Sequence, residues 1–492
     1  MRNTTSFLKS KPVFFILLPL FFVFNGFTNN YNAIPIKDAL VLFLTYSAVS
    51  LFFFAIGWLI YREPFKAAIL SLAIMSFHFF FGAIQDLLKN AFGDILITRY
   101  IFLLPFFLVV FVLLAWLLKK TKTKPVRFGF YMNILLCIFI LIDVALLIQK
   151  ISQRHPGQTF SEYAIKCNSC VKPDIYFLVF DEYSSSTTLK EALNYDNGDL
   201  DSFLVDKGFK LLPYSRSNYN FTEFSIASTL NMEYLEIPNP SACTVKDYNY
   251  CFERIKSNAV CSVLNSAGYE IINHSIFDLP KNPTPVKEDF LPLKTKLITS
   301  QTFLSRIKKD LYYHLVVGKF AINWLSKDLV YSTYFTNKKV IEGTLKAIAE
   351  SRDKPGFLYA HIEMPHPPYY FDKYGNEKTR EQIVKESRDM NITSYLDYLP
   401  KTNEVVKQIV NKIFSHSKRP FAIILLGDHG YRGEPIKKFQ FRNLNAVYYS
   451  PGKYEGFNDS ITNVNAFRLL FNNFFSTSLP LKKDSTIFLV DK

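Results

Sequence analysis

Charged residues are scarce in this sequence of 492 residues: Asp, Glu, Lys and Arg together make up 20%, against 49% hydrophobic and 16% aromatic residues. The mean hydropathy of +0.08 is too high for an ordinary soluble protein of this length. The chain also has no internal repeat and no low-complexity tract. The composition therefore argues against a wholly soluble chain, and the missing repeats argue against a repeat architecture.

A cleavage site of small residues is missing after the first apolar stretch, "PVFFILLPLFFVF". This absence argues against a secretory signal, so we expect a helix of the mature protein there. A hydrocarbon layer about 30 Å thick takes roughly 20 apolar residues as helix. Five stretches reach or approach that length, and we expect membrane spans near residues 12–27, 39–61, 67–85, 100–118 and 128–149.

Basic residues are unevenly divided between the expected loops. With the N-terminus inside, the inner side holds ten lysines and arginines, including those of the run "KKTKTKPVR", whereas the outer loops hold three. Because cytoplasmic loops retain positive charge, five crossings then leave the rest of the chain outside. We expect a multi-pass protein of a bacterial-type inner (plasma) membrane, with its membrane domain over residues 1–150, a linker over 151–172 and an extracytoplasmic domain over 173–492.

The distribution of charge gives no sign of a nucleic-acid partner. Up to residue 150 the chain holds 14 basic and 5 acidic residues, a net +9 of the formal +15. The outer region is therefore only mildly basic, and we expect no nucleic acid among its partners.

Cysteine is also rare, and five of the six cysteines lie in the expected outer region. In an oxidising compartment Cys167 is placed to pair with Cys170, and Cys243 with Cys251 or Cys261. The sequence "CNSC" has no second CxxC and no histidine pair at the spacing of a zinc ribbon, which argues against such a site.

The outer region has the rhythm of an α/β domain. Helical patterns, for instance over residues 340–352 and 403–415, alternate with short apolar runs, whereas residues 280–335 carry no readable pattern. The apolar runs predict strands at 174–180, 269–275, 357–363, 421–427 and 444–450. We expect a parallel sheet covered on both faces, an α/β/α sandwich, with active groups beyond the carboxyl ends of its strands.

Polar residues of the right kinds stand at these strand ends and at one helix start. Taken singly, each has a structural explanation: Asp181 as a helix cap, Thr222 as an N-cap, His366 in a proline-rich turn. The set comprises Asp181 and Glu182 after "IYFLVF", Thr222 opening "TEFSIAS", His361 and His366 in "YAHIEMPHPP", and Asp428 and His429 in "LLGDHG".

Together these residues predict a metal centre. Carboxylate oxygens and one imidazole are ligands that Zn²⁺ or Mn²⁺ accepts. Thr222 at a helix N-terminus is suited to nucleophilic attack, because free amides and the helix dipole stabilise an incoming anion and an adjacent cation helps to deprotonate the hydroxyl. Ser225 is the alternative nucleophile, and Glu182 is a candidate for a second ion or for orienting the ligands.

Five spans followed by a strand-end acid, a helix-start threonine, "MPHPP" and "GDHG" resemble the membrane phosphotransferase branch of the alkaline phosphatase superfamily. Lipid A phosphoethanolamine transferases and lipoteichoic acid synthases belong to that sulfatase-like branch. The resemblance implies metal ligands at Asp181, Asp428 and His429, with Thr222 as nucleophile and further ligand, followed by Ser225 as in the family's T-x-x-S spacing. It also implies that His366 contacts the substrate phosphate.

The chain departs from that family in three places. The phosphoethanolamine enzymes have a further histidine about a dozen residues after "DHG", whereas here Arg432 or Arg442 would serve an anion, together with His361. The usual glycine before the first acid is Phe180, and Asp181 stands where the family usually has Glu. The C/S-x-P-x-R sequence of true sulfatases is missing, which disfavours ordinary sulfate ester hydrolysis.

The resemblance implies an enzyme that moves a phosphoethanolamine or phosphoglycerol group from a phospholipid donor to an envelope glycan or lipid, through a phospho-threonine. One alternative is a hydrolase of the same fold, acting on phosphodiesters or sulfuric esters, in which water completes the second step. A second alternative is an inactive membrane scaffold, against which the intact set of candidate ligands argues.

Overall fold

The computed structural model describes residues 7–31, 34–152, 163, 165, 170–286, 295–310, 323–388, 390–433, 435–450, 452 and 454–491. The chain forms two compact units: a helical unit of Met1–Pro156 with Asp289–Leu315, and a catalytic unit of Gly157–Glu288 with Val316–Lys492. The chain therefore passes between the units three times. The region expected over 173–492 is interrupted by a stretch that belongs to the helical unit.

The helical unit contains one helix for each expected span. The helices are α2 (Phe14–Asn29), α3 (Ile36–Tyr61), α4 (Pro64–Phe92), α5 (Tyr100–Lys120) and α6 (Val126–Ser152), with the one-turn η1 (Leu96–Thr98) before α5. Four of the five, α3 to α6, are long and apolar enough to cross a membrane, and α2 is a shorter apolar helix. In α5 only Leu103 and Leu118 are buried, so its apolar surface suits contact with lipid.

The short helix α2 runs beside α6 in the same direction. Near its start, Asn133 Nδ2 of α6 donates to the carbonyl of Leu8 (2.7 Å). Near its end, Lys150 Nζ of α6 donates to the carbonyl of Thr28 (2.7 Å). From residue 133 to residue 150 an α-helix rises about 26 Å, close to the thickness of a hydrocarbon layer. This length fits the expectation that α2 is a membrane span.

Residues 295–310, termed here the inserted segment, lie in the helical unit although the sequence places them between parts of the catalytic unit. They form α12 (Lys296–Thr299), which packs on α2, and α13 (Phe303–Asp310), which packs on α4. Both helices lie in the stretch 280–335, which carries no readable hydrophobic pattern in the sequence. The same stretch contains the start of α15 (Asn323–Ala349).

The catalytic unit is built on a six-stranded sheet in the order β2-β6-β5-β1-β4-β3. The strands are β1 (Asp174–Phe180), β2 (Lys210–Leu211), β3 (Glu270–His274), β4 (Gly356–Ile362), β5 (Phe421–Gly427) and β6 (Asn445–Tyr449). Strands β1, β3, β4 and β5 are parallel, as expected. The expectation of an all-parallel sheet is wrong at one edge, where β6 is antiparallel to β5 and β2 to β6. Among the described residues between β5 and β6 only the one-turn η4 (Lys437–Phe439) is helical, and a parallel return needs a longer crossover.

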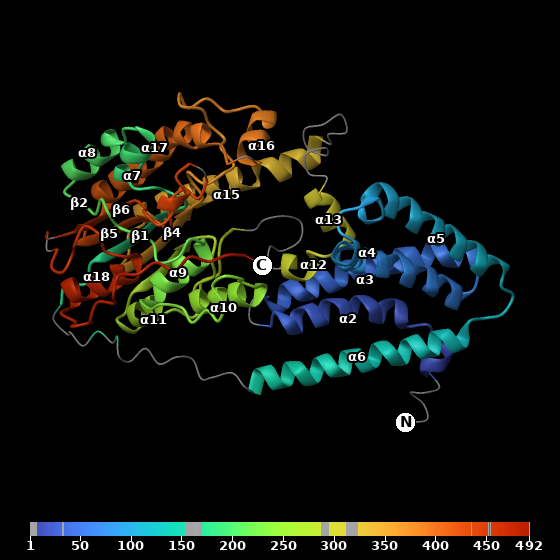
Figure 1. Ribbon diagram of the computed structural model, residues 1–492. Helices are drawn as coiled ribbons and strands as arrows, with labels where there is room; N and C mark the ends of the chain where they lie inside the picture. Colours follow the sequence, from blue (N-terminus) through green and yellow to red (C-terminus); the bar gives the residue numbers. More distant parts are fainter. Residues whose placement is uncertain are drawn as a thin grey trace. The chain divides into compact units, whose positions relative to one another are not determined.

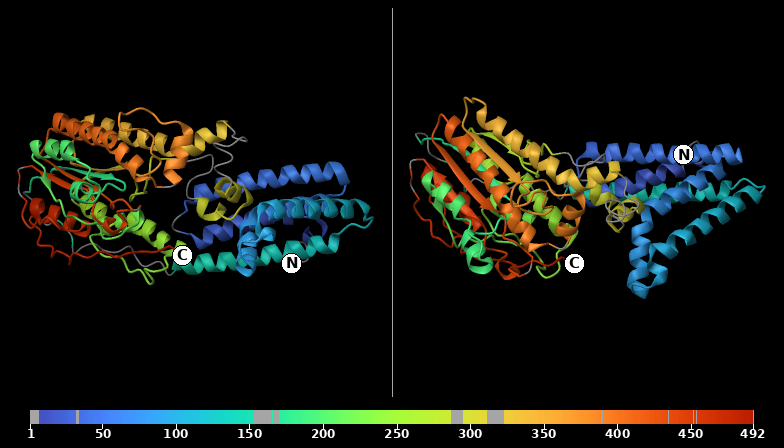
Figure 2. Two further views of the ribbon diagram at one scale, coloured as in Figure 1. Left: turned by 45° about the horizontal axis from the view of Figure 1, so that its top comes forward. Right: turned by 90° about the horizontal axis from the view of Figure 1, so that it is seen from above.

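Helices cover both faces of the sheet, as Figure 1 and the two views of Figure 2 show. One face carries α15 and α17 (Ile392–His416), and the other carries α9 (Thr222–Asn231), α11 (Ala259–Ser266) and α18 (Ala466–Phe475). The remaining elements are α7 (Ser186–Leu193), α8 (Gly198–Asp206), α10 (Val245–Lys256), α16 (Arg380–Arg388) and η5 (Asn463–Asn465). The unit is therefore an α/β/α sandwich, as the alternation of patterns predicts.

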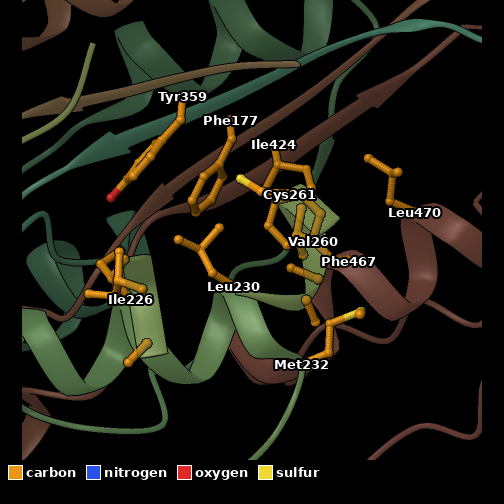
Figure 3. Packing of buried hydrophobic residues seen from close by; sticks show 14 of the residues in the cluster. Phe177, Ile226, Leu230, Met232, Val260, Cys261, Tyr359, Ile424, Phe467 and Leu470 are labelled. Atoms are coloured by element: carbon orange, nitrogen blue, oxygen red, sulfur yellow. The ribbon is translucent and has the colours of Figure 1, made fainter. Parts of the chain in front are cut away.

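Alternate residues of the central strands anchor α9, which carries Thr222. Phe177 of β1 and Tyr359 of β4 stack with ring centroids 4.9 Å apart, on the face where Ile226 and Leu230 of α9 are fully buried (Figure 3). Each such side chain contributes roughly 1.5–3 kcal/mol by burial. The anchor holds the helix against the sheet, and with it the position of its first turn.

The cysteines differ from the expected pairing. Cys243, Cys251 and Cys261 are buried free thiols, so the disulfide expected between Cys243 and one of the other two is absent. Cys251 and Cys261 lie on different helices, α10 and α11, and all three pack in the core as small hydrophobic side chains. Cys170 is disulfide-bonded, and Cys167 lies outside the described residues.

Candidate active site

The register of three parallel strands brings the candidate ligands together. Phe180, the last residue of β1, pairs with Ile362 of β4 on one side and with Gly427 of β5 on the other. Asp181 and Asp428 therefore follow neighbouring strands at the same edge of the sheet. Gly427 is needed at this point, because a Cβ there would lie 2.5 Å from the carbonyl oxygen of Tyr183. The strand-end position expected for these residues is thus the one that the fold provides.

Asp181, Asp428 and His429 form a buried cluster whose ligand atoms all lie within 4.8 Å of one another. His429 Nε2 is 3.3 Å from Asp428 Oδ2 and 3.7 Å from Asp181 Oδ1. Tetrahedral bonds of about 2.0–2.2 Å place ligand atoms about 3.3–3.6 Å apart. The spacing of the three groups is therefore close to that of a coordination shell.

The hydrogen bonds around the cluster leave the inward atoms available. Asp428 Oδ1 accepts from the backbone amides of Glu182 and His429, at 2.9 Å each. His429 Nδ1 contacts the carbonyl of Gly430 (2.8 Å), which fixes the proton on Nδ1 and the lone pair on Nε2. Asp181 Oδ1 and Asp428 Oδ2 are buried without a hydrogen-bond partner among the described residues. Two unpartnered carboxylate oxygens facing an imidazole lone pair fit a divalent cation.

Thr222 is the first residue of α9 and faces this cluster. Its Oγ1 lies 3.4 Å from His429 Nε2. Phe221 in extended conformation precedes it and provides no side-chain cap, while the carboxylate of Glu223, in the first turn of α9, accepts a hydrogen bond from its own backbone amide. A partly exposed hydroxyl at a helix N-terminus beside a cation-binding cluster is suited to attack on an anionic phosphorus centre.

Ser225, the alternative nucleophile, has a different environment. Its hydroxyl donates to the carbonyl of Asp428 at 2.6 Å, and the residue is fully buried. The first turn of α9 is thus tied to the loop after β5, on which both Asp428 and His429 lie. In this geometry Ser225 holds the loop in place, and Thr222 has the accessible hydroxyl.

Two further histidines lie on the β4 side of the cluster. His361, on β4, has Nε2 at 3.8 Å from Asp181 Oδ2, and its Nδ1 is 2.9 Å from the hydroxyl of Tyr359. His366 comes after the strand, with its backbone amide bonded to the carbonyl of Asp181 (3.2 Å). The Nδ1 of His366 contacts the carbonyl of Pro367 at 2.6 Å, which places its lone pair on Nε2.

The charges of these groups shift one another's pKa values. Burial acts to raise the pKa of Asp181, but His366, His361 and His429 outweigh it and hold that pKa below its usual value. Burial acts to lower the pKa of His361, but the carboxylate of Asp181 outweighs it and raises the pKa. Asp181 and Glu182 raise the pKa of His366 in the same way. The carboxylate of Asp181, with these three histidines around it, therefore keeps its negative charge at the position where a cation would bind.

Glu182, which is buried, pairs with the partly exposed Arg432 next to His366. Glu182 Oε1 accepts from the backbone amide of Arg432 (2.9 Å) and lies 3.5 Å from its Nε. Arg432 Nη2 in turn lies 3.2 Å from His366 Nε2. The guanidinium Cζ is 5.9 Å from the ring centroid of Phe221, the residue before Thr222. Glu182 thus fixes the guanidinium, which lies between His366 and the start of α9.

The two arginines proposed for the anion differ in position. The guanidinium of Arg442 pairs with Glu191 (Nη1 to Oε2, 3.2 Å) and lies over the rings of Tyr214 and Phe439. Within the described part of the chain it has no recorded contact with Asp181, Thr222 or the other members of the cluster. The geometry therefore favours Arg432 as the anion-binding arginine.

Two asparagines before Thr222 were not singled out from the sequence. Asn220 exchanges hydrogen bonds with the backbone of Leu489, Nδ2 to carbonyl at 3.0 Å and amide to Oδ1 at 2.8 Å. Asn218 Oδ1 accepts from the amide of Val464 (2.7 Å), and its Nδ2 donates to the carbonyl of Ser485 (3.1 Å). The alternation in "NYNF" places both side chains on one side of an extended backbone, which is a signal that the sequence offers.

Comparisons with known proteins give the following matches. Residues 258–470 match the family model described as Sulfatase. No curated protein matches the chain. Among solved structures, the C-terminal periplasmic domain of EcEptC from Escherichia coli in complex with Zn is similar at 10% identity and a TM-score of 0.39, covering 66% of this chain and 88% of that one.

Two other similar structures come from further organisms. The integral membrane protein lipooligosaccharide phosphoethanolamine transferase A (EptA) from Neisseria meningitidis has 13% identity and a TM-score of 0.37, covering 94% of this chain and 96% of that one. The putative sulfatase yidJ from Bacteroides fragilis has 14% identity and a TM-score of 0.38, covering 67% and 77%. The family match shows that residues 258–470, in the C-terminal part of this chain, are similar to the Sulfatase family.

Proposed function

We propose that the chain is a metal-dependent, membrane-anchored phosphotransferase. It moves a phospho-headgroup, of the phosphoethanolamine or phosphoglycerol type, from a phospholipid donor to a glycan or lipid acceptor of the cell envelope. The reaction passes through a phospho-threonine at Thr222. The observation that carries the proposal is the 3.4 Å distance from Thr222 Oγ1 to His429 Nε2, beside buried carboxylate oxygens that have no hydrogen-bond partner among the described residues.

The residues present fit a divalent cation, Zn²⁺ or Mn²⁺. Asp181, Asp428 and His429 would hold it, with Thr222 as a further ligand. When bound, such an ion lowers the pKa of a coordinated hydroxyl and neutralises charge on phosphoryl oxygens. Two carboxylates and one imidazole suit both metals, so the identity of the ion awaits metal analysis of the purified protein.

In the first half-reaction the oxygen of Thr222 forms a bond to phosphorus, and the bond from phosphorus to the diacylglycerol oxygen breaks. The hydroxyl proton passes, overall, to that leaving oxygen. Backbone amides of the first turn of α9 and the guanidinium of Arg432 would donate to the phosphoryl oxygens, where negative charge is greatest. Arg432 is held in place for this by Glu182, which is itself fully buried.

In the second half-reaction an acceptor hydroxyl bonds to phosphorus, the bond from phosphorus to Thr222 Oγ1 breaks, and the proton of the acceptor passes, overall, to that oxygen. His366 is suited to carry the proton of the acceptor, because its Nδ1 is held by the carbonyl of Pro367 and its Nε2 has the lone pair. Without substrate this Nε2 lies against Arg432. A bound phosphoryl group would draw the guanidinium toward itself and release the imidazole.

The membrane helices determine where in the cell the proposed reaction takes place. We place the chain in the inner (plasma) membrane with the catalytic unit on the outer side, because lysines and arginines gather in the loops of the opposite side. Anchoring raises the effective concentration of lipid donors at the catalytic unit. This provides a physical reason for joining apolar helices and a sulfatase-like domain in one chain.

The proposal is tested by mass spectrometry of the full-length protein after incubation with phospholipid membranes. A phosphoethanolamine or phosphoglycerol adduct on the peptide that contains Thr222, absent in Thr222→Ala, would support it and reveal the transferred group. Metal-depleted protein should form no adduct. An adduct of the same mass and yield in Thr222→Ala would refute the assignment of the nucleophile.

A hydrolase of the same fold is a second candidate, favoured by the family model described as Sulfatase. Water, in place of an acceptor hydroxyl, would then release the phosphoryl group from Thr222. The sequence lacks C/S-x-P-x-R, so we place phosphodiesters ahead of sulfate esters as substrates. Analysis of a donor lipid labelled in its headgroup distinguishes the two: a free labelled headgroup indicates hydrolysis, and a labelled glycan or lipid indicates transfer.

A further inference from the structure

The inserted segment, residues 295–310, is bound closely to the end of α4. The backbone amide of Gly82 in α4 donates to the carbonyl of Gln301 at 2.9 Å. A Cβ at position 82 would lie 2.6 Å from that carbonyl oxygen and 2.7 Å from Nε of Arg306. Gly82 is therefore needed for this approach, and almost any side chain there would push the segment away from the helix.

An ion pair and aromatic packing surround this backbone contact. Arg306 pairs with Asp86 of α4, one helical turn beyond Gly82, and only 14% of the Arg306 side chain is exposed. Phe303 of α13 packs against two rings of α4, with centroid distances of 4.8 Å to Phe77 and 5.0 Å to Phe81. An acidic residue near the end of an apolar helix is thus matched by an arginine that comes from the catalytic part of the sequence.

The inserted segment also contacts α5 and α2. Asp310 Oδ2 accepts from the hydroxyl of Tyr100, the first residue of α5, at 2.5 Å. Ile298 of α12 packs into the core of the helical unit, against Gly26 of α2. The segment therefore joins the ends of three helices, including α5, which buries few of its own side chains.

By topology, these contacts lie on the same side of the membrane as the end of α6, after which the chain continues into the catalytic unit. From the end of α4 to the end of α6 the chain crosses twice, along α5 and α6, so both ends lie on the same side. Outside residues 295–310, the chain around the segment returns to the catalytic unit in both directions. Docking of the segment thus adds two covalent links between the units to the one that follows α6.

We propose that the inserted segment is a docking element that holds the catalytic unit at the lipid surface from which the donor is taken. This inference rests on the proposed function, because it takes the donor to be a membrane phospholipid. With the segment released, only the connection after α6 would tether the catalytic unit, and its active site would sample a larger volume. The rate with a lipid donor then falls with the effective concentration, whereas the rate with a small dissolved diester does not.

The test reverses the charge of the pair in full-length protein reconstituted in vesicles of phosphatidylethanolamine and phosphatidylglycerol. Asp86→Arg and Arg306→Asp are each expected to lower turnover of the vesicle lipid about tenfold or more, and to leave turnover of a soluble nitrophenyl phosphodiester within about twofold. The double exchange Asp86→Arg with Arg306→Asp should restore lipid turnover. The matched control is Asp94→Arg, which breaks the exposed pair of Asp94 with Arg99 and should change neither activity.

Lipid turnover that stays within about twofold in both single variants would overturn the docking role, as would a parallel loss of both activities, because that indicates a general folding defect. A readout without catalysis is cross-linking of Asp86→Cys with Arg306→Cys in membranes by a bismaleimide whose span replaces the two native side chains. A cross-link supports the docking, and its absence overturns it. If wild-type protein turns over neither substrate while the double-cysteine variant cross-links, the proposed function is refuted and the docking stands.

Discussion

Replacing Arg432 tests the anion site most directly, because its guanidinium lies between His366 and the start of α9. The guanidinium is held by Glu182, lies 3.2 Å from His366 Nε2 and is only partly exposed, at 24% of its side chain. A unit charge about 4 Å from a phosphoryl oxygen contributes up to about 4 kcal/mol at an effective dielectric constant of about 20. The net value of a charge-assisted hydrogen bond is smaller, about 1.5–3 kcal/mol.

We therefore expect Arg432→Ala to lower kcat/KM for the donor by roughly 10- to 150-fold. Arg432→Lys keeps the positive charge but loses bidentate hydrogen bonding, so its loss of kcat/KM should be smaller than that of Arg432→Ala. The matched control is Arg442→Ala, which removes an arginine that pairs with Glu191 away from the cluster. Its kcat/KM should stay close to that of the wild type.

The role of Glu182 in this arrangement is tested by a double-mutant cycle. Glu182→Gln alone should lower kcat/KM less than Arg432→Ala, because the backbone amide of Arg432 retains a partner in the new amide oxygen. Added to Arg432→Ala, it should have little further effect, since it acts through the guanidinium. Initial rates with a labelled phospholipid measure all four variants. Equal kcat/KM for Arg432→Ala and Arg442→Ala would refute the assignment of the anion site.

Three further outcomes follow from contacts in the catalytic unit. Ser225→Ala leaves a buried carbonyl without its donor and should lower the free energy of unfolding by about 1–3 kcal/mol while the phospho-adduct still forms; loss of the adduct in a folded variant would contradict this. In the metal-free protein, the pKa values of His361 and His366 are raised, so the stability they contribute is present below about pH 6.5 and is lost as pH rises through their folded-state values. A cation opposes their protonation, so the rise in Tm on adding Zn²⁺ or Mn²⁺ should be larger at about pH 8 than at about pH 6, and an equal rise would argue against a cation beside them. Asn220→Ala removes both hydrogen bonds to Leu489 and should cost about 2–4 kcal/mol in urea unfolding; a cost below about 0.5 kcal/mol would mean that these two bonds do not stabilise the catalytic unit.

The position of the site could be predicted from the sequence because strand ends can be read locally. The runs that end before Asp181 and Asp428 match the observed β1 and β5, and neighbouring parallel strands end at one edge. Thr222 could likewise be placed at the start of a helix from the pattern that follows it. For these residues, local pattern and global fold agree.

Other features depend on contacts that local pattern does not encode. Glu182 distinguishes Arg432 from Arg442, because its carboxylate accepts a hydrogen bond from the backbone amide of Arg432, which lies 250 residues later in the sequence. The direction of β6 follows from the connection between Gly427 and Asn445, whose described residues contain the one-turn η4 and no longer crossover helix. The inserted segment has short helices, and the main partners of α13 lie on α4. Helix α13 is amphipathic, but with eight residues it is too short for its pattern to reveal its place.

The bond between Asn220 and Leu489 joins residues 269 positions apart. During synthesis, the stretch that presents Thr222 leaves the ribosome long before the backbone that braces it. The stretch before Thr222 can therefore form these two hydrogen bonds only after nearly all of the catalytic unit has been synthesised. If Thr222 is the nucleophile that we propose, a chain that ends before Leu489 would keep Asp181, Asp428 and His429 and still lack the bonds that fix the backbone before its threonine.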